Sequence, residues 1–267
     1  MKITFFFAEL FLLDLFTCCH AYPQYPLPDI EDAAFIEDYV RAHNKFRSKV
    51  NPPASNMFRM SWDAALAKTA KAWAKKCKFK HNIYLKVPRK VHPTFTPVGE
   101  NIWTGTATIF SVDTALSDWF NEVSSYNFHT NKCAGMCGHY TQVVWAESYK
   151  VGCAVHFCNT VENFPRLSRA AHFVCNYGPA GNYPRKPYKA GQPCSGCSNE
   201  KCIDKLCGKT KITLPPTPPY IPPAEHPRPS CDQYCIIVLS LRPLFLVLST
   251  GAVLLLQQRF PQTFFNE

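Results

Sequence analysis

The sequence predicts an α+β fold, a sandwich in which helices pack against a sheet of short strands. Three segments carry apolar side chains at the three- and four-residue spacing of helices. Shorter segments rich in valine, phenylalanine and tyrosine indicate strands. Helices and strands are mixed without regular alternation, which favours an α+β arrangement.

The helices are expected in residues 31–50, 62–77 and 111–126. The apolar stripe of the first consists of Phe35, Ile36, Tyr39, Val40, His43 and Phe46. The Asn-Pro-Pro that follows should end this helix. Asp63 and Ser111 stand where the second and third helices need an N-cap. Strands are expected at 99–103, 151–158 and 171–177.

The cysteine content is typical of a secreted protein cross-linked by disulfide bonds. The chain has 267 residues and 14 cysteines, without the paired spacing of a zinc ribbon. Residues 1–21 are expected to be a signal peptide, because an apolar stretch follows Lys2 and small residues precede a cleavage point after Ala21. Cleavage there removes Cys18 and Cys19 and leaves an even number of cysteines.

The net charge of +10 is scattered, and no nucleic-acid-binding motif occurs, so nucleic acid is not an expected partner.

The composition changes after about residue 190. Residues 191–208 hold four cysteines, and so short a segment depends on cross-links rather than on a core. Residues 209–234 are rich in proline, which is typical of an extended stalk. Residues 235–256 are apolar and long enough to span a membrane, followed by a short cytoplasmic tail, 257–267. A single-pass type I span, a lipid-anchor signal and a secreted form are the alternatives. We expect a protein of the secretory pathway, attached to the cell-surface membrane through its C-terminus or secreted.

Four motifs identify the chain by resemblance. "GHYTQVVW" (138–145) and "FVCNYGPAGNY" (173–183) resemble the two signature motifs of the family of cysteine-rich secretory proteins, antigen 5 and pathogenesis-related proteins. "HNKFR" (43–47) and "GENIW" (99–103) are similar to its two shorter motifs. The resemblance covers roughly residues 30–207. Within the family, the chain is most similar to the glioma pathogenesis-related group.

The resemblance implies a three-layer α-β-α sandwich over residues 30–190 and a cysteine-rich hinge over 191–208. It also implies five disulfide bonds: Cys77–Cys158, Cys133–Cys137, Cys153–Cys175, Cys194–Cys202 and Cys197–Cys207. The spacing of these ten cysteines alone leaves their pairing open. Family members that regulate ion channels have a further cysteine-rich domain after the hinge. That domain is not expected here, because only Cys231 and Cys235 follow Cys207.

The resemblance further implies a central cleft lined by His81, Glu100, Glu122 and His139. The two histidines match the family's metal ligands, and neutral imidazoles bind divalent zinc well. The two glutamates would orient the imidazoles or bind a metal-bound water. A metal-free network of charged hydrogen bonds is the alternative. No third protein ligand, which catalytic zinc sites usually have, is evident in the sequence.

Other histidines and the tryptophans are expected to be structural. His43 lies on the apolar stripe of the first helix, with Asn44 and Arg47 as its expected hydrogen-bond partners. His156 and His172 lie on predicted strands and are expected to face outward. The tryptophans expected in the core are Trp103, Trp119 and Trp145.

These observations favour a non-enzymatic extracellular domain that binds a protein partner, or a sterol or other lipid, at the cell surface. Family members are implicated in reproduction and immune defence, and the resemblance implies a role of that kind. A zinc-dependent hydrolase or protease is one alternative, although the chain has neither HExxH nor GxSxG. A secreted sterol or lipid carrier is the other. The loops 83–98 and 159–170 are expected to contact a partner.

Overall fold

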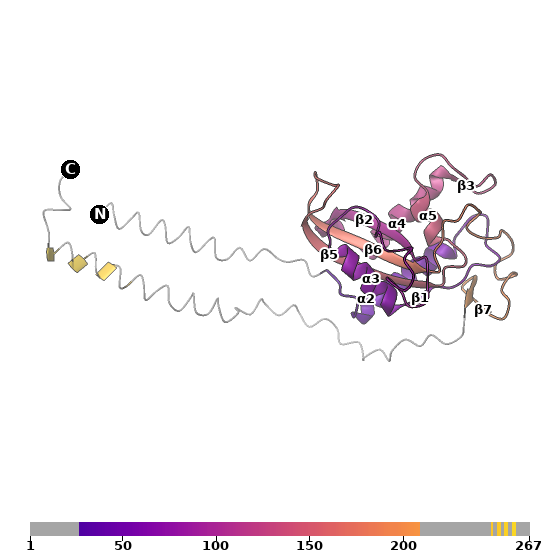
Figure 1. Cartoon of the computed structure of the whole chain (residues 1–267), viewed down its shortest axis with the longest axis horizontal. Coiled ribbons are helices and arrows are strands. Elements are labelled where there is room, and N and C mark those ends of the chain that lie inside the picture. Colours follow the sequence, from indigo (N-terminus) through magenta and orange to yellow (C-terminus); the bar gives the residue numbers. More distant parts are fainter. Residues whose placement is uncertain (1–26, 209–246, 248–249, 252–253, 256–257, 260–267) are drawn as a thin grey trace. The chain divides into compact units, whose positions relative to one another are not determined.

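The computed structural model describes residues 27–208 and, beyond them, Val247, Thr250, Gly251, Leu254, Leu255, Gln258 and Arg259. The chain divides into two compact units, Met1–Thr213 and Leu214–Glu267. The first unit contains the sheet and the packed helices (Figure 1). In the second, the seven described residues are helical.

The first unit contains helices and strands in mixed order. Its α-helices are α2 (Ala33–Arg47), α3 (Ala64–Ala74), α4 (Val112–Asn121) and α5 (Gly138–Val143). Two short 3₁₀ helices are η1 (Ala107–Ile109) and η2 (Glu122–Ser125). Its strands are β1 (Ser61–Trp62), β2 (Gly99–Thr106), β3 (Tyr126–Asn127), β4 (Lys132–Cys133), β5 (Lys150–Thr160), β6 (Ser168–Gly178), β7 (Lys201–Ile203) and β8 (Leu206–Gly208).

A four-stranded sheet with the order β1-β5-β6-β2 lies between two layers of helices (Figure 1). The three longer strands pair antiparallel, and β1 pairs parallel with β5. Side chains alternate along β6, so that Phe173, Cys175 and Tyr177 pack against α2, α4 and α5, whereas Val174 packs against α3. The predicted three-layer α-β-α sandwich is therefore confirmed.

The helix starts follow the signals in the sequence, but all three predicted helices end earlier than expected, the first at Arg47 rather than at residue 50. The side chains of Asp63 and Ser111 accept hydrogen bonds from backbone N–H groups in the first turns of α3 and α4. The helix expected over 62–77 stops at Ala74, because Cys77 has a left-handed backbone with φ 51°. The helix expected over 111–126 changes to a 3₁₀ turn at Glu122.

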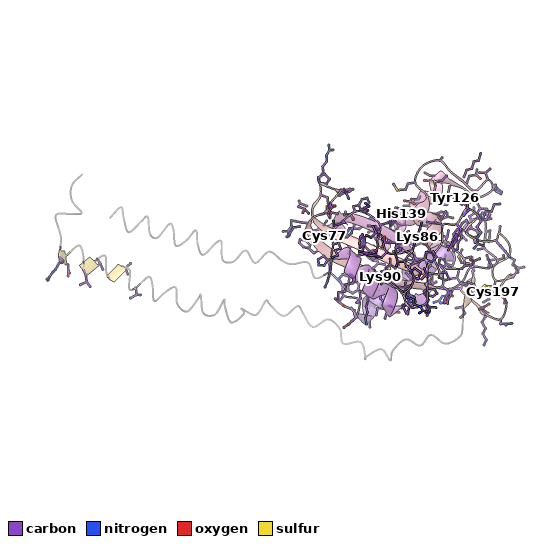
Figure 2. The ribbon with its side chains drawn as sticks, viewed as in Figure 1. Cys77, Lys86, Lys90, Tyr126, His139 and Cys197 are labelled. Carbon is purple, nitrogen blue, oxygen red and sulfur yellow. A yellow bond between two sulfur atoms is a disulfide. The ribbon has the colours of Figure 1, made fainter. Side chains whose placement is uncertain are left out.

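Five disulfide bonds cross-link the first unit: Cys77–Cys158, Cys133–Cys137, Cys153–Cys175, Cys194–Cys202 and Cys197–Cys207. They are the five pairs that the family resemblance implies. Figure 2 shows Cys77 near one end of this unit and Cys197 near the other. These disulfides and the three hydrophobic clusters of the described core all lie within residues 27–208. The unit thus has its own core and cross-links, and we expect it to fold without the remainder of the chain.

The expected signal peptide (1–21) and stalk (209–234) lie outside the described residues. The apolar segment 235–256 and the tail 257–267 are described only at the seven positions named above. Within the part of the chain that the structure describes, no helix combines the length and the apolar character needed to cross a membrane.

His172 is fully buried, and the expectation that it faces outward is wrong. It lies in β6 between β5 and β2, and the backbone of Lys78 lies next to it. Its Nδ1 lies 2.6 Å from Oγ1 of Thr104, and burial lowers the pKa of His172 to about 4. His156, its cross-strand partner, is half-buried. The tryptophans expected in the core are there: Trp119 and Trp145 are buried, and Trp103 packs against the core.

Candidate functional site

The first half of the candidate site is a histidine held by a buried glutamate. Glu100 is the second residue of β2, and its side chain is fully buried. Its Oε1 lies 2.9 Å from Nδ1 of His81 and accepts a hydrogen bond of 2.9 Å from the backbone N–H of Asn82. The hydrogen bond to Glu100 raises the pKa of His81. The buried Oε2 of Glu100 has no hydrogen-bond partner among the described residues, so this carboxylate still has an acceptor to offer.

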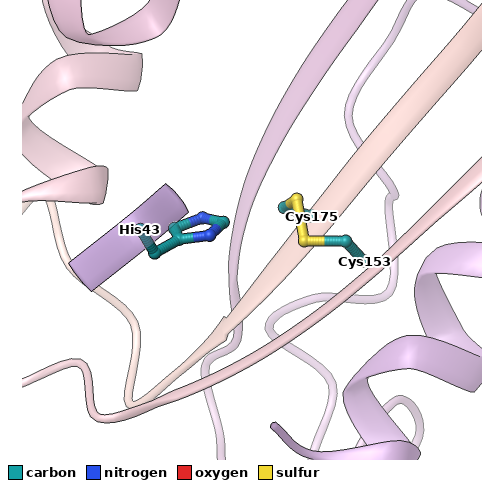
Figure 3. A group of neighbouring side chains, drawn as sticks. All are labelled: His43, Cys153 and Cys175. Carbon is teal, nitrogen blue, oxygen red and sulfur yellow. A yellow bond between two sulfur atoms is a disulfide. The ribbon is translucent and has the colours of Figure 1, made fainter. Parts of the chain in front are cut away.

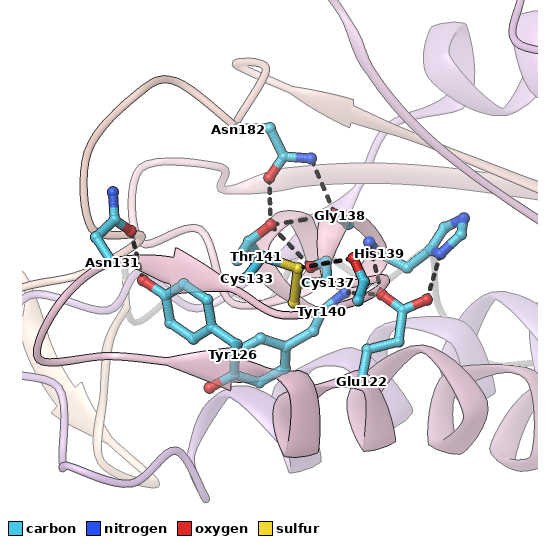
Figure 4. The surroundings of a disulfide bond; sticks show 11 residues. Glu122, Tyr126, Asn131, Cys133, Cys137, Gly138, His139, Tyr140, Thr141 and Asn182 are labelled. Atoms are coloured by element: carbon cyan, nitrogen blue, oxygen red, sulfur yellow. Dashed lines mark hydrogen bonds and ion pairs between the residues drawn. A yellow bond between two sulfur atoms is a disulfide. The ribbon is translucent and has the colours of Figure 1, made fainter.

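The second half is a histidine at the start of α5, held by Glu122 at the end of α4 (Figure 4). Nδ1 of His139 lies 2.6 Å from Oε1 of Glu122. Oε2 of Glu122 accepts the backbone N–H groups of His139 and Tyr140 at 3.0 and 3.2 Å. Cys137, the N-cap residue of α5, makes no side-chain hydrogen bond at the cap. Glu122 therefore supplies from another helix the negative cap that the N-terminus of α5 needs.

Three further contacts fix the position of His139. Its ring stacks on Trp119 at 6.0 Å between centroids, with 12° between the planes. The Cys133–Cys137 disulfide ties the residue before α5 to β4. Figure 4 shows Asn182 reaching the same helix, where its side chain hydrogen-bonds Thr141 and the carbonyl of Gly138. The imidazole is thus held from its ring face, its backbone and its Nδ1.

The two histidine–glutamate pairs are linked at the start of β2. Asn101, next to Glu100, donates a hydrogen bond of 3.0 Å to the backbone carbonyl of His139. In both pairs the glutamate contacts Nδ1, and Nε2 has no hydrogen bond to a described residue. A neutral imidazole that donates from Nδ1 to a carboxylate presents its Nε2 lone pair to a metal, as in carboxylate–histidine–zinc sites. The two Nε2 atoms are therefore of the donor type that zinc accepts, whereas in the described residues His81, His139 and Glu100 do not bring one ligand atom each within 4.8 Å of one another.

A different group of three potential ligands stands out by proximity and does not fit a metal. Ligand atoms of His43, Cys153 and Cys175 lie within 4.8 Å of one another, the only such group in the described residues (Figure 3). The two sulfurs are joined in a disulfide bond and carry no thiolate. Both ring nitrogens of His43 are occupied, by the carbonyl of Tyr39 at 2.7 Å and the hydroxyl of Tyr177 at 3.0 Å. These atoms form structural hydrogen bonds and a disulfide.

Asn44 and Arg47 were expected to be the hydrogen-bond partners of His43, and this expectation is wrong. Asn44 instead donates to the carbonyl and accepts from the N–H of Met60. Arg47 is fully buried, and burial lowers its pKa to about 9. Its guanidinium donates to the carbonyls of Phe58, Val143, Trp145, Ala146 and Ser148 at 2.6–3.1 Å. Arg47 thereby holds in place the segment that follows α5, the helix that contains His139.

The motif assignment missed Asn101, the stacking role of Trp119 and the carbonyl contacts of Arg47. Asn101 and Arg47 lie in the quoted motifs, and Trp119 lies in the helix expected over 111–126. Their side-chain partners are distant in sequence, so periodicity could not identify the contacts. The only signal was that Asn101 and Arg47 lie within the family motifs.

Comparison with known proteins agrees with this architecture. The cysteine-rich secretory protein family matches residues 40–177. Glioma pathogenesis-related protein 1 of Mus musculus is 54% identical over 182 residues, which are 68% of this chain and 67% of the relative. GLIPR1-like protein 1 of Homo sapiens is 46% identical over 221 residues, which are 81% of this chain and 88% of the relative. Among solved structures, NaASP2 with Zn²⁺ is similar, with a TM-score of 0.50 and 28% identity; the match covers 69% of this chain and 98% of that one.

Proposed function

Because the chain belongs to the cysteine-rich secretory protein family, we propose that it is a non-enzymatic extracellular binding domain whose histidine–glutamate pairs hold zinc. Its five disulfide bonds suit the oxidising extracellular compartment. Its partner is an extracellular or membrane protein, or a sterol or other lipid. Reproduction or immune defence is the setting that the family resemblance favours.

The observation that carries the proposal is the shared geometry of the two pairs. His81 and His139 would bind zinc through Nε2, while Glu100 and Glu122 hold their Nδ1 atoms. Bound zinc would supply open coordination positions that a partner's carboxylate, carbonyl or imidazole can fill. A solved relative, NaASP2, has a structure with Zn²⁺, which agrees with this assignment.

Binding is favoured over hydrolysis by the small number of ligands. Catalytic zinc sites usually have three protein ligands, and in the described residues no three of these four side chains bring one ligand atom each within 4.8 Å of one another. Both glutamates also orient histidines and cap or hold backbone N–H groups. Neither carboxylate is therefore free to act only as a general base.

Zinc titration by calorimetry tests the assignment. We expect residues 22–208 to bind zinc and the double variant His81→Ala/His139→Ala to lose that binding while remaining folded. The matched control, His129→Ala/His156→Ala, also removes two histidines and should bind zinc as the unchanged protein does. Equal loss in both double variants would mean that the metal binds histidines without regard to this site.

Two further measurements separate binding from its alternatives. A pull-down of surface proteins with the unchanged fragment and the His81→Ala/His139→Ala variant tests whether partner binding uses the metal. Zinc-dependent hydrolysis of a peptide or ester, lost in Glu100→Gln, would replace the proposal by a hydrolase. Sterol binding that persists in the double variant would instead support a lipid carrier.

A further inference from the structure

One segment of the domain contains basic residues and no acidic ones. Residues 64–99, from the start of α3 to the start of β2, include eight lysines and Arg89 but neither aspartate nor glutamate. The complete chain has 29 Lys+Arg and 19 Asp+Glu, so acidic residues elsewhere largely offset the basic ones. The excess positive charge of this protein is therefore concentrated in one stretch, and the expectation that it is scattered along the sequence is wrong.

This stretch folds into one surface, because the loop that follows α3 is fastened to α3 at both ends. Trp73 donates from its indole N–H to the carbonyl of Lys80 at 2.8 Å. Thr69 donates from its hydroxyl to the carbonyl of Val91 at 2.5 Å. The lysines of α3 and those of the loop consequently lie on adjoining surfaces, and we call the exposed Lys and Arg side chains of residues 64–99 the basic face. Lys86 and Lys90 of this face are labelled in Figure 2.

Most of the charge on the basic face is not neutralised by the protein. Lys71 pairs with Asp29 and Lys78 with Glu162. The other seven basic side chains of the segment form no ion pair with any residue that the structure describes. The effect reaches His156 in β5, whose pKa is lowered by burial and then by Lys75 and Lys71. The face thus presents uncompensated positive charge.

The positions of the lysines suit an extended ligand rather than a single anion. Lys68, Lys71 and Lys75 are three and four residues apart, so they follow one side of α3 over about 10 Å. Lys86 and Lys90 continue the charge into the loop. A line of positive charge is complementary to a linear polymer with regularly spaced negative groups.

We propose that the basic face binds a linear sulfated polysaccharide. Closely spaced sulfates would contact successive lysines, and release of the counterions that such a polymer condenses would favour binding. The exposed ring of Tyr84, with Lys90 5.6 Å from its centre, offers a surface on which a sugar can pack. The assignment goes beyond the proposed zinc function, because it depends on lysine and arginine side chains and not on His81, which lies in the same segment.

An anionic membrane is the other partner that this charge could attract. Ile83, Tyr84 and Val87 are 64%, 44% and 44% exposed, and side chains of this kind can enter a bilayer interface. They occupy only the tip of the loop, however, whereas the basic residues extend along α3 as well. The polymer contacts the whole line of charge, so it is the partner that the observations favour.

The test measures binding of residues 22–208 to a size-defined heparin oligosaccharide in the presence of EDTA. The variant Lys75→Gln/Lys86→Gln/Lys90→Gln removes three charges from α3 and the loop. We expect its affinity to fall about tenfold or more at about 0.15 M salt, and the slope of log Kd against log salt to fall by about two to three. The matched control, Lys132→Gln/Lys189→Gln/Lys201→Gln, removes three exposed charges elsewhere and should change the affinity less than about twofold.

Each outcome decides for or against the proposal. Loss of heparin affinity in the basic-face variant alone supports it, and the His81→Ala/His139→Ala variant should bind heparin unchanged even if the zinc assignment fails. Equal losses in the two lysine variants would show a general effect of net charge and overturn the proposal. Binding to phosphatidylserine vesicles without binding to heparin would overturn it in favour of a membrane. Near-ultraviolet circular dichroism of each variant verifies the fold.

Discussion

Replacement of Arg47 by methionine is the sharpest test of how the domain holds α5 in place. The guanidinium is fully buried and donates to five backbone carbonyls, most of them in the chain that follows α5. Methionine fills a similar volume with no donor, so the variant removes the hydrogen bonds while keeping most of the packing. We expect the domain to lose stability and the position of His139 to loosen.

The expected loss of unfolding free energy depends on which of the five carbonyls keep another hydrogen-bond donor. Trp145 and Ala146 also accept backbone N–H groups, whereas the carbonyls of Phe58, Val143 and Ser148 lose their only donor. At about 1 kcal/mol for each buried oxygen without a donor, the three cost about 3 kcal/mol. Removing a buried cation returns part of its desolvation free energy, so the net loss should be about 2–3 kcal/mol.

Guanidinium chloride unfolding of residues 22–208, with disulfides intact, measures this loss. The matched control is Arg41→Met in the same helix, where the arginine is exposed and pairs with Asp38 and Asp113. The control should lose no more than about 1 kcal/mol. If Arg47→Met and Arg41→Met lose the same amount, Arg47 does not support the fold through its carbonyl contacts.

Three further predictions concern the titratable groups of the site and core. Glu122→Gln weakens the cap of α5 and should cost about 1 kcal/mol in urea unfolding while lowering zinc affinity about tenfold or more in calorimetry; unchanged zinc affinity would contradict its role. The raised pKa of His81 means that its pairing with Glu100 stabilises the fold below the unfolded-state pKa and loses this effect as pH rises through the folded-state pKa. In an NMR titration, the pKa of His81 should be lower in Glu100→Gln than in the unchanged protein, and an unchanged pKa would refute the pairing. The zinc affinity of the unchanged protein should rise with pH. Burial lowers the pKa of His43 to about 4, so the unfolded chain binds more protons between about pH 4 and 6.5 and the unfolding free energy should decrease as pH falls through that range. His43→Gln should flatten the dependence seen in unfolding curves, and a dependence as steep as before would exclude His43 as its source.

Local signals in the sequence were sufficient for the three longer α-helices, the three longer strands and the family of this chain. Asp63 and Ser111 cap the helices that follow them because a cap contacts N–H groups only two or three residues away. The strands at 151–158 and 171–177 were recognisable from the residue types that strands favour. Such features depend on near neighbours, and near neighbours can be read from the sequence.

The orientation of polar side chains was less predictable. His172 was expected to face outward, but strand alternation cannot say which residues of a central strand are covered on both faces. His43 was placed correctly on a buried stripe, yet its partner is Tyr177, far along the chain. Burial and long-range hydrogen bonds depend on which elements pack together, and periodicity within one element does not specify that.

By itself, the sequence determined the three-layer class, the family and the residue types of the histidine–glutamate pairs. Only the tertiary structure decided that Glu122 both caps α5 and holds His139, that Asn101 links the two pairs, and that Arg47 holds the carbonyls behind them. The physical reason is distance along the chain. Each of these contacts joins segments at least about 17 residues apart, and their geometry exists only once the sheet and both helical layers have assembled.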